Sequence, residues 1–218
     1  MSTFKKPAFD DSLVLPQWIQ YNARHSPEHP LFIYESSHGD LKTITWSKAA
    51  QSIEIAAHLI HPYLKGRRQA ERLPPVAGIL ANLGSCCLSS LAMENHTIVY
   101  PDSITYHTLY LAILRAGGTV FPISTRNSPV AISHLLRETG THMLFVSADE
   151  PTQKLVSAAL GASAADHKVD VIEIPSLQEL YSEGARGDNT EQLPDYPENI
   201  LDLPAIIWHS SGINCYSL

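Results

Sequence analysis

Residues 111–124 read Leu-Ala-Ile-Leu-Arg-Ala-Gly-Gly-Thr-Val-Phe-Pro-Ile-Ser and join an apolar helix pattern to a short strand pattern. Gly117 and Gly118 predict where the helix ends, because glycine adopts the left-handed conformation that closes many helices at little cost. Pro122 is suited to the exit of the strand that follows. This stretch therefore predicts a helix, a tight turn and a strand, built by residues that shape the fold and do not catalyse.

The alternation of short apolar runs with longer amphipathic stretches continues on both sides of this stretch. Strands are predicted at 76–81, 119–123, 143–146, 169–174 and 205–208, and helices at 103–115, 129–139, 150–160 and 176–181. Such alternation is typical of parallel βα units. Because buried parallel strands need helices on both faces, we expect an α/β fold with a three-layer, mainly parallel sheet and right-handed crossovers.

The first 75 residues follow a different pattern of a helix, a hairpin and a second helix. The first helix is predicted at 13–23, and the hairpin strands at 31–34 and 41–45 flank turn residues 36–40. The second helix opens near Trp46, where either Thr45 or Ser47 can cap its free amides. Its apolar face is predicted to contain Ile53, Ala56, Ala57 and Ile60.

Composition excludes several classes of partner. Of the 218 residues, 44% are hydrophobic and 17% are charged, which is typical of a globular chain, and no apolar run is long enough to span a bilayer. The net charge is -7 and no basic stripe is present, so we expect neither a nucleic acid nor a membrane as partner. No apolar stretch of signal-peptide length precedes Trp18, so the expected location is the cytoplasm.

The thiols and imidazoles predict no metal site. Cys86, Cys87 and Cys215 are odd in number and two of them are adjacent, which fits neither a disulfide framework nor the usual spacing of zinc ligands. The 11 histidines form no H-E-x-x-H pattern. We therefore assign no metal ligand, and no catalytic residue, in this sequence.

Residues 204–212 read Pro-Ala-Ile-Ile-Trp-His-Ser-Ser-Gly, an apolar strand that runs into small hydroxyl residues and glycine. Glycine lets backbone amides approach a phosphate closely, and serine hydroxyls donate hydrogen bonds to its oxygens. Ser210, Ser211 and Gly212 are therefore the candidate phosphate-binding residues.

Three stretches in this order, 44–50 (Ile-Thr-Trp-Ser-Lys-Ala-Ala), 111–124 and 204–212, resemble the superfamily of adenylate-forming enzymes. That superfamily includes acyl-CoA synthetases, luciferases and the adenylation domains of nonribosomal peptide synthetases. The sequence of residues 121–129, Phe-Pro-Ile-Ser-Thr-Arg-Asn-Ser-Pro, is most similar to the corresponding sequence of fungal enzymes that resemble nonribosomal peptide synthetases. The resemblance implies that this chain is the N-terminal part of the large domain of such an enzyme.

The resemblance also implies a chemistry for the full-length family. ATP and magnesium activate a carboxylic acid substrate to an acyl-adenylate, and the acyl group then moves to the thiol of a phosphopantetheine carrier. The family's phosphate loop reads roughly S-S-G-S-T-G-x-P-K, of which only Ser210, Ser211 and Gly212 match here, and residues 213–218 depart from it. The adenine and acid pockets also lack counterparts, so we expect an inactive N-terminal fragment that binds ATP weakly or not at all and holds no magnesium.

Two alternatives belong to other functional classes. The first is a noncatalytic truncated or mis-spliced product that acts as a binding or interaction module. The second is a dinucleotide-binding domain, which is disfavoured because no G-x-G-x-x-G follows the strand that ends at Ala81.

The family resemblance divides the chain into segments. Residues 1–75 are the N-terminal helix and hairpin region, residues 76–212 are the parallel α/β part of the same domain, and residues 213–218 are a tail outside the family pattern. Residues 84–101 are predicted to be an insert, because family members run almost directly from strand to helix at this point. We hypothesise that residues 84–101 and 213–218 are both translated introns. The alternative is that 84–101 is a surface loop of the protein and that the protein is naturally short.

Overall fold

Strands and helices alternate from residue 76 onward in the predicted order. The computed structural model describes residues 4–7, 13–36, 39–65, 73–81, 101–162, 167–182, 192–196 and 200–209. The strands are β1 (Pro30–Glu35), β2 (Leu41–Thr45), β3 (Val76–Leu80), β4 (Thr119–Ile123), β5 (Met143–Val146) and β6 (Asp170–Glu173). The helices are α1 (Leu15–His25), α2 (Trp46–Lys65), α3 (Pro101–Arg115), α4 (Pro129–Glu138), α5 (Glu150–Gly161) and α6 (Leu177–Tyr181), with a short 3-10 helix at Ile200–Asp202.

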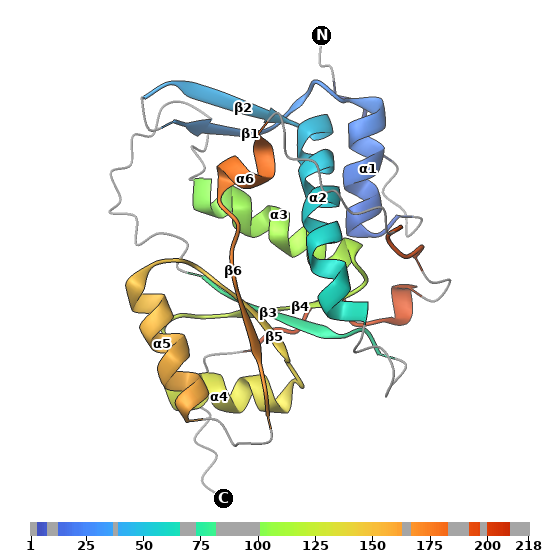
Figure 1. Ribbon diagram of the computed structural model, residues 1–218. Helices are drawn as coiled ribbons and strands as arrows, with labels where there is room; N and C mark the ends of the chain where they lie inside the picture. The colour runs from blue at the N-terminus through green and yellow to red at the C-terminus, as the bar shows by residue number, and fades with distance from the viewer. Residues whose placement is uncertain are drawn as a thin grey trace, which may run out of the picture.

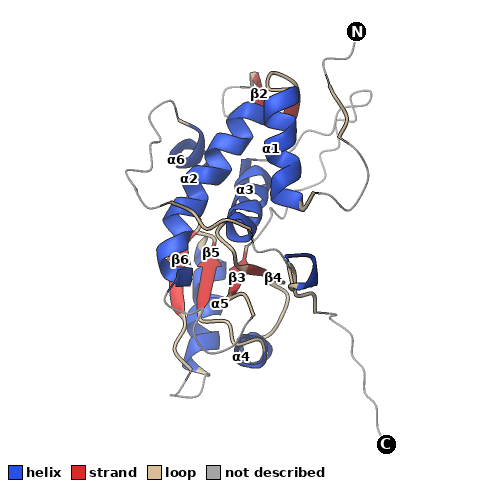
Figure 2. Cartoon of the chain, turned by 90° about the vertical axis from the view of Figure 1, so that its right-hand side faces the viewer, coloured by secondary structure: helices blue, strands red, loops and turns tan. Residues whose placement is uncertain are grey.

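The main sheet is parallel and has the order β4-β3-β5-β6. Its first strand, β3, lies between β4 and β5, and Gly78 of β3 pairs with Phe121 on one side and Leu144 on the other. Figure 1 shows the sheet across the middle of the molecule, with α1, α2, α3 and α6 on one side and α4 and α5 on the other. Figure 2 shows the same three layers after a quarter turn, so the predicted three-layer α/β architecture is confirmed.

The strand predicted at 205–208 is present only in part. Ile206 forms a single parallel bridge with Val120, on the edge of β4 that faces away from β3. The Val120 N–H donates to the Ala205 carbonyl at 2.9 Å, and the Ile207 N–H donates to the Val120 carbonyl at 2.9 Å. Val120 is therefore the residue of β4 whose backbone hydrogen bonds attach this segment to the sheet.

Two apolar clusters, one on each face of the sheet, make up the core. The larger one contains the predicted face of α2, where Ile53, Ala56, Ala57 and Ile60 are between 0% and 4% exposed. The smaller one joins Ile132 of α4 and Val156 of α5 to Phe121 and Leu144 of the sheet. Each large buried side chain contributes about 1.5–3 kcal/mol, so burial on both faces stabilises the layered arrangement. Because α2 packs in the same cluster as α3, the first 75 residues share this core.

Local signals fixed several helix starts as predicted. Of the two candidate caps for α2, Thr45 is the one used, since its Oγ1 accepts from the Lys48 N–H at 3.4 Å. Ser128 caps α4, its Oγ accepting from the Ala131 N–H at 3.2 Å. The hairpin β1–β2 is antiparallel as predicted. Helix α1 begins at Leu15, two residues later than predicted, because the Val14 N–H is held by Gln17 Oε1 at 2.9 Å, outside the helix.

Glycine is needed at both positions between α3 and β4, but for different physical reasons. Gly117 has a φ of 82°, in the left-handed region that glycine favours. Gly118 lies where α3 approaches α2, because a Cβ there would lie 3.0 Å from side-chain atoms of both Ile113 and Leu64. Residues 111–124 therefore build the turn between helix and strand, as the sequence predicts.

Two predicted segments lie outside the described residues. Of the predicted insert 84–101, only Pro101 is described, as the first residue of α3. The predicted tail 213–218 is not described at all. Both segments therefore stay predictions. Within the described ranges, no helix has the length and the apolar character needed to cross a membrane.

Replacing Gly117 by alanine is expected to lower the free energy of unfolding by about 1–2 kcal/mol, because a Cβ is strained in the left-handed region. Urea unfolding followed by circular dichroism measures the change. The matched control is Gly161→Ala, since Gly161 ends a helix, has no positive φ, and has no atom within 4 Å of an added Cβ. Equal effects of the two substitutions would contradict the conformational role of Gly117.

Candidate functional site

The C-terminal ends of the parallel strands meet at one edge of the sheet, which we call the carboxyl edge. Ala81 follows β3, Ser124 follows β4, Ser147 follows β5, and His209 ends the short segment attached to β4. Ligands of open α/β sheets bind at this edge. The predicted phosphate-binding residues Ser210, Ser211 and Gly212 come directly after His209 in the sequence. They lie outside the described residues, so their role stays a prediction.

The segment 204–209 lies along β4 and is attached to it at successive positions. Thr119 Oγ1 donates to the Pro204 carbonyl at 2.6 Å, ahead of the two backbone hydrogen bonds of Val120. Ile207 packs against the core cluster under α4 and α5. The backbone of this segment is thereby held in line as it approaches the carboxyl edge.

At the end of this segment, the His209 ring meets two residues from the region of β4. The Phe121 ring lies edge-on to it, with ring centroids 5.9 Å apart. Asn127 Nδ2 lies 3.5 Å from His209 Nε2. The turn that holds Asn127 is itself closed, because the Asn127 N–H donates to the Ser124 carbonyl at 3.2 Å and the Arg126 N–H to Ser124 Oγ at 3.2 Å. Two stretches about 80 residues apart, 121–129 and 204–209, are thus brought together.

The loop after β5 places a carboxylate at the same edge. Burial acts to raise the pKa of Asp149, but hydrogen bonds outweigh it and lower the pKa below its usual value. Ser147 Oγ donates to Asp149 Oδ2 at 2.6 Å, and the Thr152 N–H and hydroxyl donate to Oδ1 at 3.0 and 2.7 Å. Asp149 is also the N-cap of α5. The observed role of Asp149 is therefore structural, as the cap of α5.

The described residues at this edge fit an anion better than a metal ion. Magnesium bound with a nucleotide takes oxygen ligands from phosphates and from one or two carboxylates. Both oxygens of Asp149 already accept hydrogen bonds, whereas Asn127, Arg126 and His209 offer N–H donors. Among the described residues, no group of three or more His, Cys, Asp or Glu could hold a metal ion.

Two histidines spaced four apart, His25 and His29, do not form a metal pair on one helix. Helix α1 ends at His25. The His25 ring stacks on Tyr21 at 4.0 Å, and the His29 ring lies 5.1 Å from Phe4.

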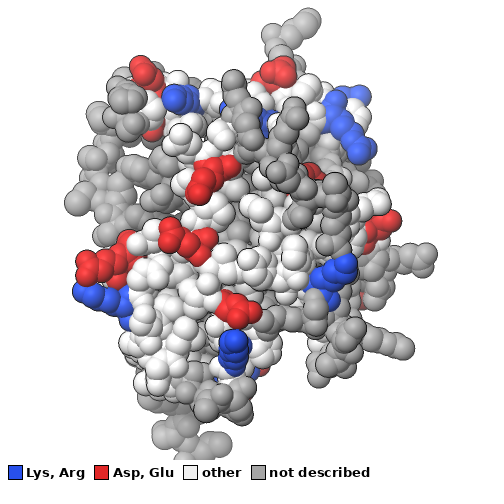
Figure 3. All heavy atoms as spheres, in the orientation of Figure 1, with Lys and Arg blue, Asp and Glu red and all other residues white. Residues whose placement is uncertain are grey.

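The face of the molecule in Figure 3 shows Lys and Arg side chains apart from one another, so the described residues there form no basic stripe for a nucleic acid.

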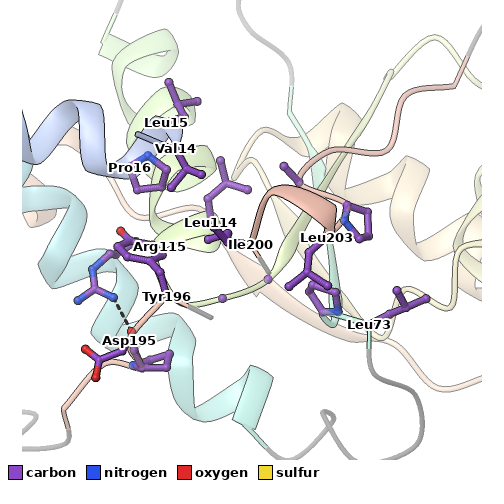
Figure 4. A pocket seen from close by; sticks show the side chains of 16 residues that line it. Val14, Leu15, Pro16, Leu73, Leu114, Arg115, Asp195, Tyr196, Ile200 and Leu203 are labelled. Atoms are coloured by element: carbon purple, nitrogen blue, oxygen red, sulfur yellow. Dashed lines mark hydrogen bonds between the residues drawn. The ribbon is translucent and has the colours of Figure 1, made fainter. Parts of the chain in front are cut away.

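The opposite, amino edge of the sheet contains a pocket of about 350 Å³ that the sequence did not predict. Figure 4 shows its largely apolar wall, to which Leu15, Leu114, Ile200 and Leu203 contribute. These residues come from separate segments of the chain, so no local pattern could have marked them. An apolar wall does not suit a triphosphate.

The polar groups beside this pocket form hydrogen bonds with one another. Arg115 Nε donates to Glu54 Oε1 at 2.8 Å, and Arg115 Nη1 donates to the Pro194 carbonyl at 3.0 Å. The guanidinium also lies 5.4 Å from the centre of the Tyr196 ring. Burial raises the pKa of Tyr196 to about 12, with Arg115 lowering it and Glu54 raising it. A phenol with this pKa stays protonated at neutral pH and does not serve as a base.

Comparison with known proteins identifies the family. Residues 88–213, more than half of the chain, match the sequence profile of the family described as AMP-binding enzyme. The chain belongs to the AMP-binding enzyme family. The match begins inside the predicted insert 84–101, which stays a prediction. Membership confirms the resemblance drawn from residues 44–50, 111–124 and 204–212.

Relatives of this AMP-binding family chain are much longer than it is. Adenylate-forming reductase Nps10 of Heterobasidion annosum is 30% identical over 217 residues, which are 94% of this chain and 18% of that protein. The chain spans less than a fifth of the length of each of the three curated relatives. The predicted similarity to fungal adenylate-forming enzymes is thus confirmed.

Solved structures support the same fold. The N-terminal domain of FACL13 from Mycobacterium tuberculosis superposes with a TM-score of 0.59 at 18% identity, over 92% of this chain and 42% of that chain. The nonribosomal peptide synthetase FmoA3 gives a TM-score of 0.53 at 15% identity, over 95% of this chain and 17% of that one. At such identities the likeness concerns the fold, which is that of the N-terminal part of an adenylate-forming enzyme.

Asp149→Asn tests the capping carboxylate at the carboxyl edge. The folded-state pKa of Asp149 is lowered, so its contribution is present above the pKa of the unfolded chain and is lost as the pH falls through the folded value. The variant is therefore expected to be less stable than the parent at neutral pH, with a difference that shrinks below about pH 4. Urea unfolding midpoints across this pH range measure it.

The control is Glu150→Gln on the first turn of the same helix. Glu150 pairs with Lys154 at 2.6 Å, but both side chains are more than 70% exposed, so its loss is expected to change stability little. A difference between Asp149→Asn and the parent that stays constant from neutral pH to below about pH 4 would show that the carboxylate charge is irrelevant.

Proposed function

We propose that this chain is the N-terminal part of an adenylation domain whose full-length form activates a carboxylic acid with ATP. The observation that carries the proposal is the meeting of residues 121–129 and 204–209 at the carboxyl edge, through Asn127 and His209. This contact brings the approach to the candidate phosphate loop to the edge where open α/β sheets bind ligands. Family membership supports the same chemistry.

In the proposed reaction, a carboxylate oxygen of the acid attacks the α-phosphorus of ATP. A new bond joins that oxygen to phosphorus, the bond to the bridging oxygen breaks, and pyrophosphate leaves with its electron pair. Magnesium supplies charge neutralisation for the phosphates when it is bound. The protein contributes by positioning donors where negative charge develops. Backbone amides at Gly212 and the hydroxyls of Ser210 and Ser211 are the proposed donors in this chain.

The acyl group is then proposed to pass to the thiol of a phosphopantetheine carrier, with release of AMP. The thiolate attacks the acyl carbon, and the bond from that carbon to the phosphate oxygen breaks. The similarity to proteins named adenylate-forming reductases supports a route in which the carried acyl group is reduced afterwards. The acid and the carrier are partners of the full-length protein, which we place in the cytoplasm.

We further propose that the 218-residue chain does not complete this reaction. Residues 213–218 supply no lysine, although a cation at the phosphate loop adds charge that holds the triphosphate. A noncatalytic interaction module is the second candidate. It is favoured by two exposed apolar side chains in the segment 200–209, where Leu201 is 65% and Trp208 is 73% exposed.

The test is acid-dependent exchange of labelled pyrophosphate into ATP over a panel of aryl and 2-oxo acids. The present chain is compared with a chain extended after Gly212 by the remaining adenylation sequence of its genomic locus, with and without residues 84–101. We expect no exchange by the 218-residue chain, and exchange by an extended chain. Exchange by the unextended chain, or a micromolar dissociation constant for ATP from calorimetry, would overturn the proposed inactivity.

A further inference from the structure

The amino-edge pocket is formed by segments that are far apart in the sequence. Its wall comes from the start of α1, the residues before β3, the end of α3 and the stretch 194–205. Its volume of about 350 Å³ lies within the range of small-molecule sites, which is roughly 300–1,000 Å³. An apolar cavity of about 150 Å³ holds one benzene, so this pocket has room for a molecule of about two rings.

The pocket opens to solvent beside exposed apolar side chains. Leu15 and Leu73 line it and are 48% and 55% exposed. Leu201, in the 3-10 helix between the lining residues Ile200 and Leu203, is also exposed. Exposed apolar surface that surrounds an apolar hollow is typical of a binding site, because burial there by a ligand is favourable.

The charged groups at the pocket disfavour a charged ligand. Arg115 and Asp195 are the charged side chains among the residues that line it. The Arg115 charge is already paired, because Nε donates to Glu54 Oε1 at 2.8 Å. The Asp195 carboxylate and the C-terminal end of α3 disfavour an anion, and the guanidinium disfavours a cation. An uncharged ligand avoids both penalties.

The rest of the wall offers apolar contact. Figure 4 shows Leu114, Ile200 and Leu203 around the pocket. Tyr196 also lines it, but the hydroxyl oxygen of Tyr196 is buried out of contact with water and is therefore not the atom that a ligand meets. The wall thus resembles ligand sites in which apolar contact supplies most of the affinity.

We propose that the amino-edge pocket is a binding site for an uncharged, apolar small molecule of about two rings. The site lies at the opposite edge of the sheet from the carboxyl edge. The inference therefore goes beyond the proposed function and assumes no phosphate or acid chemistry.

The first measurement titrates the 218-residue chain with N-phenyl-1-naphthylamine, an uncharged fluorophore that brightens in apolar surroundings. We expect saturable binding with a dissociation constant on the order of 10 µM, as is usual for a ligand of this size. Uncharged 2-naphthol is expected to displace it at concentrations at least about tenfold lower than 2-naphthoate or protonated 2-naphthylmethylamine, because burying an unpaired charge is costly. Absence of saturable binding, or equal displacement by a charged analogue, would overturn the inference.

The second measurement fills the pocket from two separate segments, with Ala205→Phe and Val14→Trp. Each variant is expected to raise the dissociation constant of the fluorophore at least about tenfold, since the added ring takes the place of the ligand. Val130→Phe is the matched control, because Val130 lies on α4, is 69% exposed and does not line the pocket. Circular dichroism verifies that each variant is folded. Unchanged affinity in the folded filling variants, or an equal loss in the control, would refute the site.

Hydrogen exchange of the parent chain locates the ligand without any substitution. The Val120 N–H donates to the Ala205 carbonyl and the Leu203 N–H to the Ile200 carbonyl, and both acceptor residues line the pocket. These amides are expected to exchange more slowly with the fluorophore bound, while the Ala131 N–H of α4 is unchanged. Slowing at Ala131 alone, or at none of these amides, would contradict the proposed location.

A second copy of this chain is the alternative occupant of the pocket. Sedimentation that shows a dimer, its dissociation in Ala205→Phe, and no binding of the fluorophore would together overturn the small-molecule site. Binding of the fluorophore without pyrophosphate exchange by any extended chain would support the site and refute only the proposed function. Exchange by an extended chain, with no fluorophore binding to either chain, would refute only the site.

Discussion

Each backbone group of a buried strand needs a hydrogen-bond partner, and this constraint arranges β3, β4 and β5. β3 uses both of its edges, since it pairs with β4 on one side and with β5 on the other. β4 is also buried, and its outer edge receives the segment 205–207 through the N–H and the carbonyl of Val120. The backbone requirements of β4, together with the hydrogen bond from Thr119 Oγ1 to the Pro204 carbonyl, therefore position the approach to the candidate phosphate loop.

Much of this fold follows from short-range patterns. Gly117 ends α3, Ser128 caps α4, and the strands from β3 to β6 lie within one or two residues of their predicted bounds, because each is set by residues close in sequence. The strand at 205–208 was predicted from its apolar run, yet only Ile206 pairs. An apolar run shows that a segment suits a strand, but the extent of pairing depends on the partner edge.

The candidate site could be predicted only as a segment, not as an arrangement. The motif at 210–212 marks where phosphate chemistry is expected, but the contact of Asn127 with His209 spans 82 positions and has no local signal. The apolar pocket at the amino edge likewise gathers separate segments. Residues 121–129 were identified only by their sequence similarity to the family. The structure shows that this stretch contacts His209, the residue before the candidate loop, through Asn127 and Phe121.

The polarity of the two edges follows from the parallel topology. Helices α4 and α5 begin at Pro129 and Glu150, directly after the loops of the carboxyl edge, so their positive N-terminal ends lie at that edge. Helix α3 ends at Arg115 beside the amino-edge pocket, where the C-terminal end of a helix favours a cation. Each helix end contributes about 0.3–1 kcal/mol toward a suitable charge. An anion is therefore favoured at the carboxyl edge and disfavoured in the pocket, in agreement with the donors that Asn127 and His209 offer.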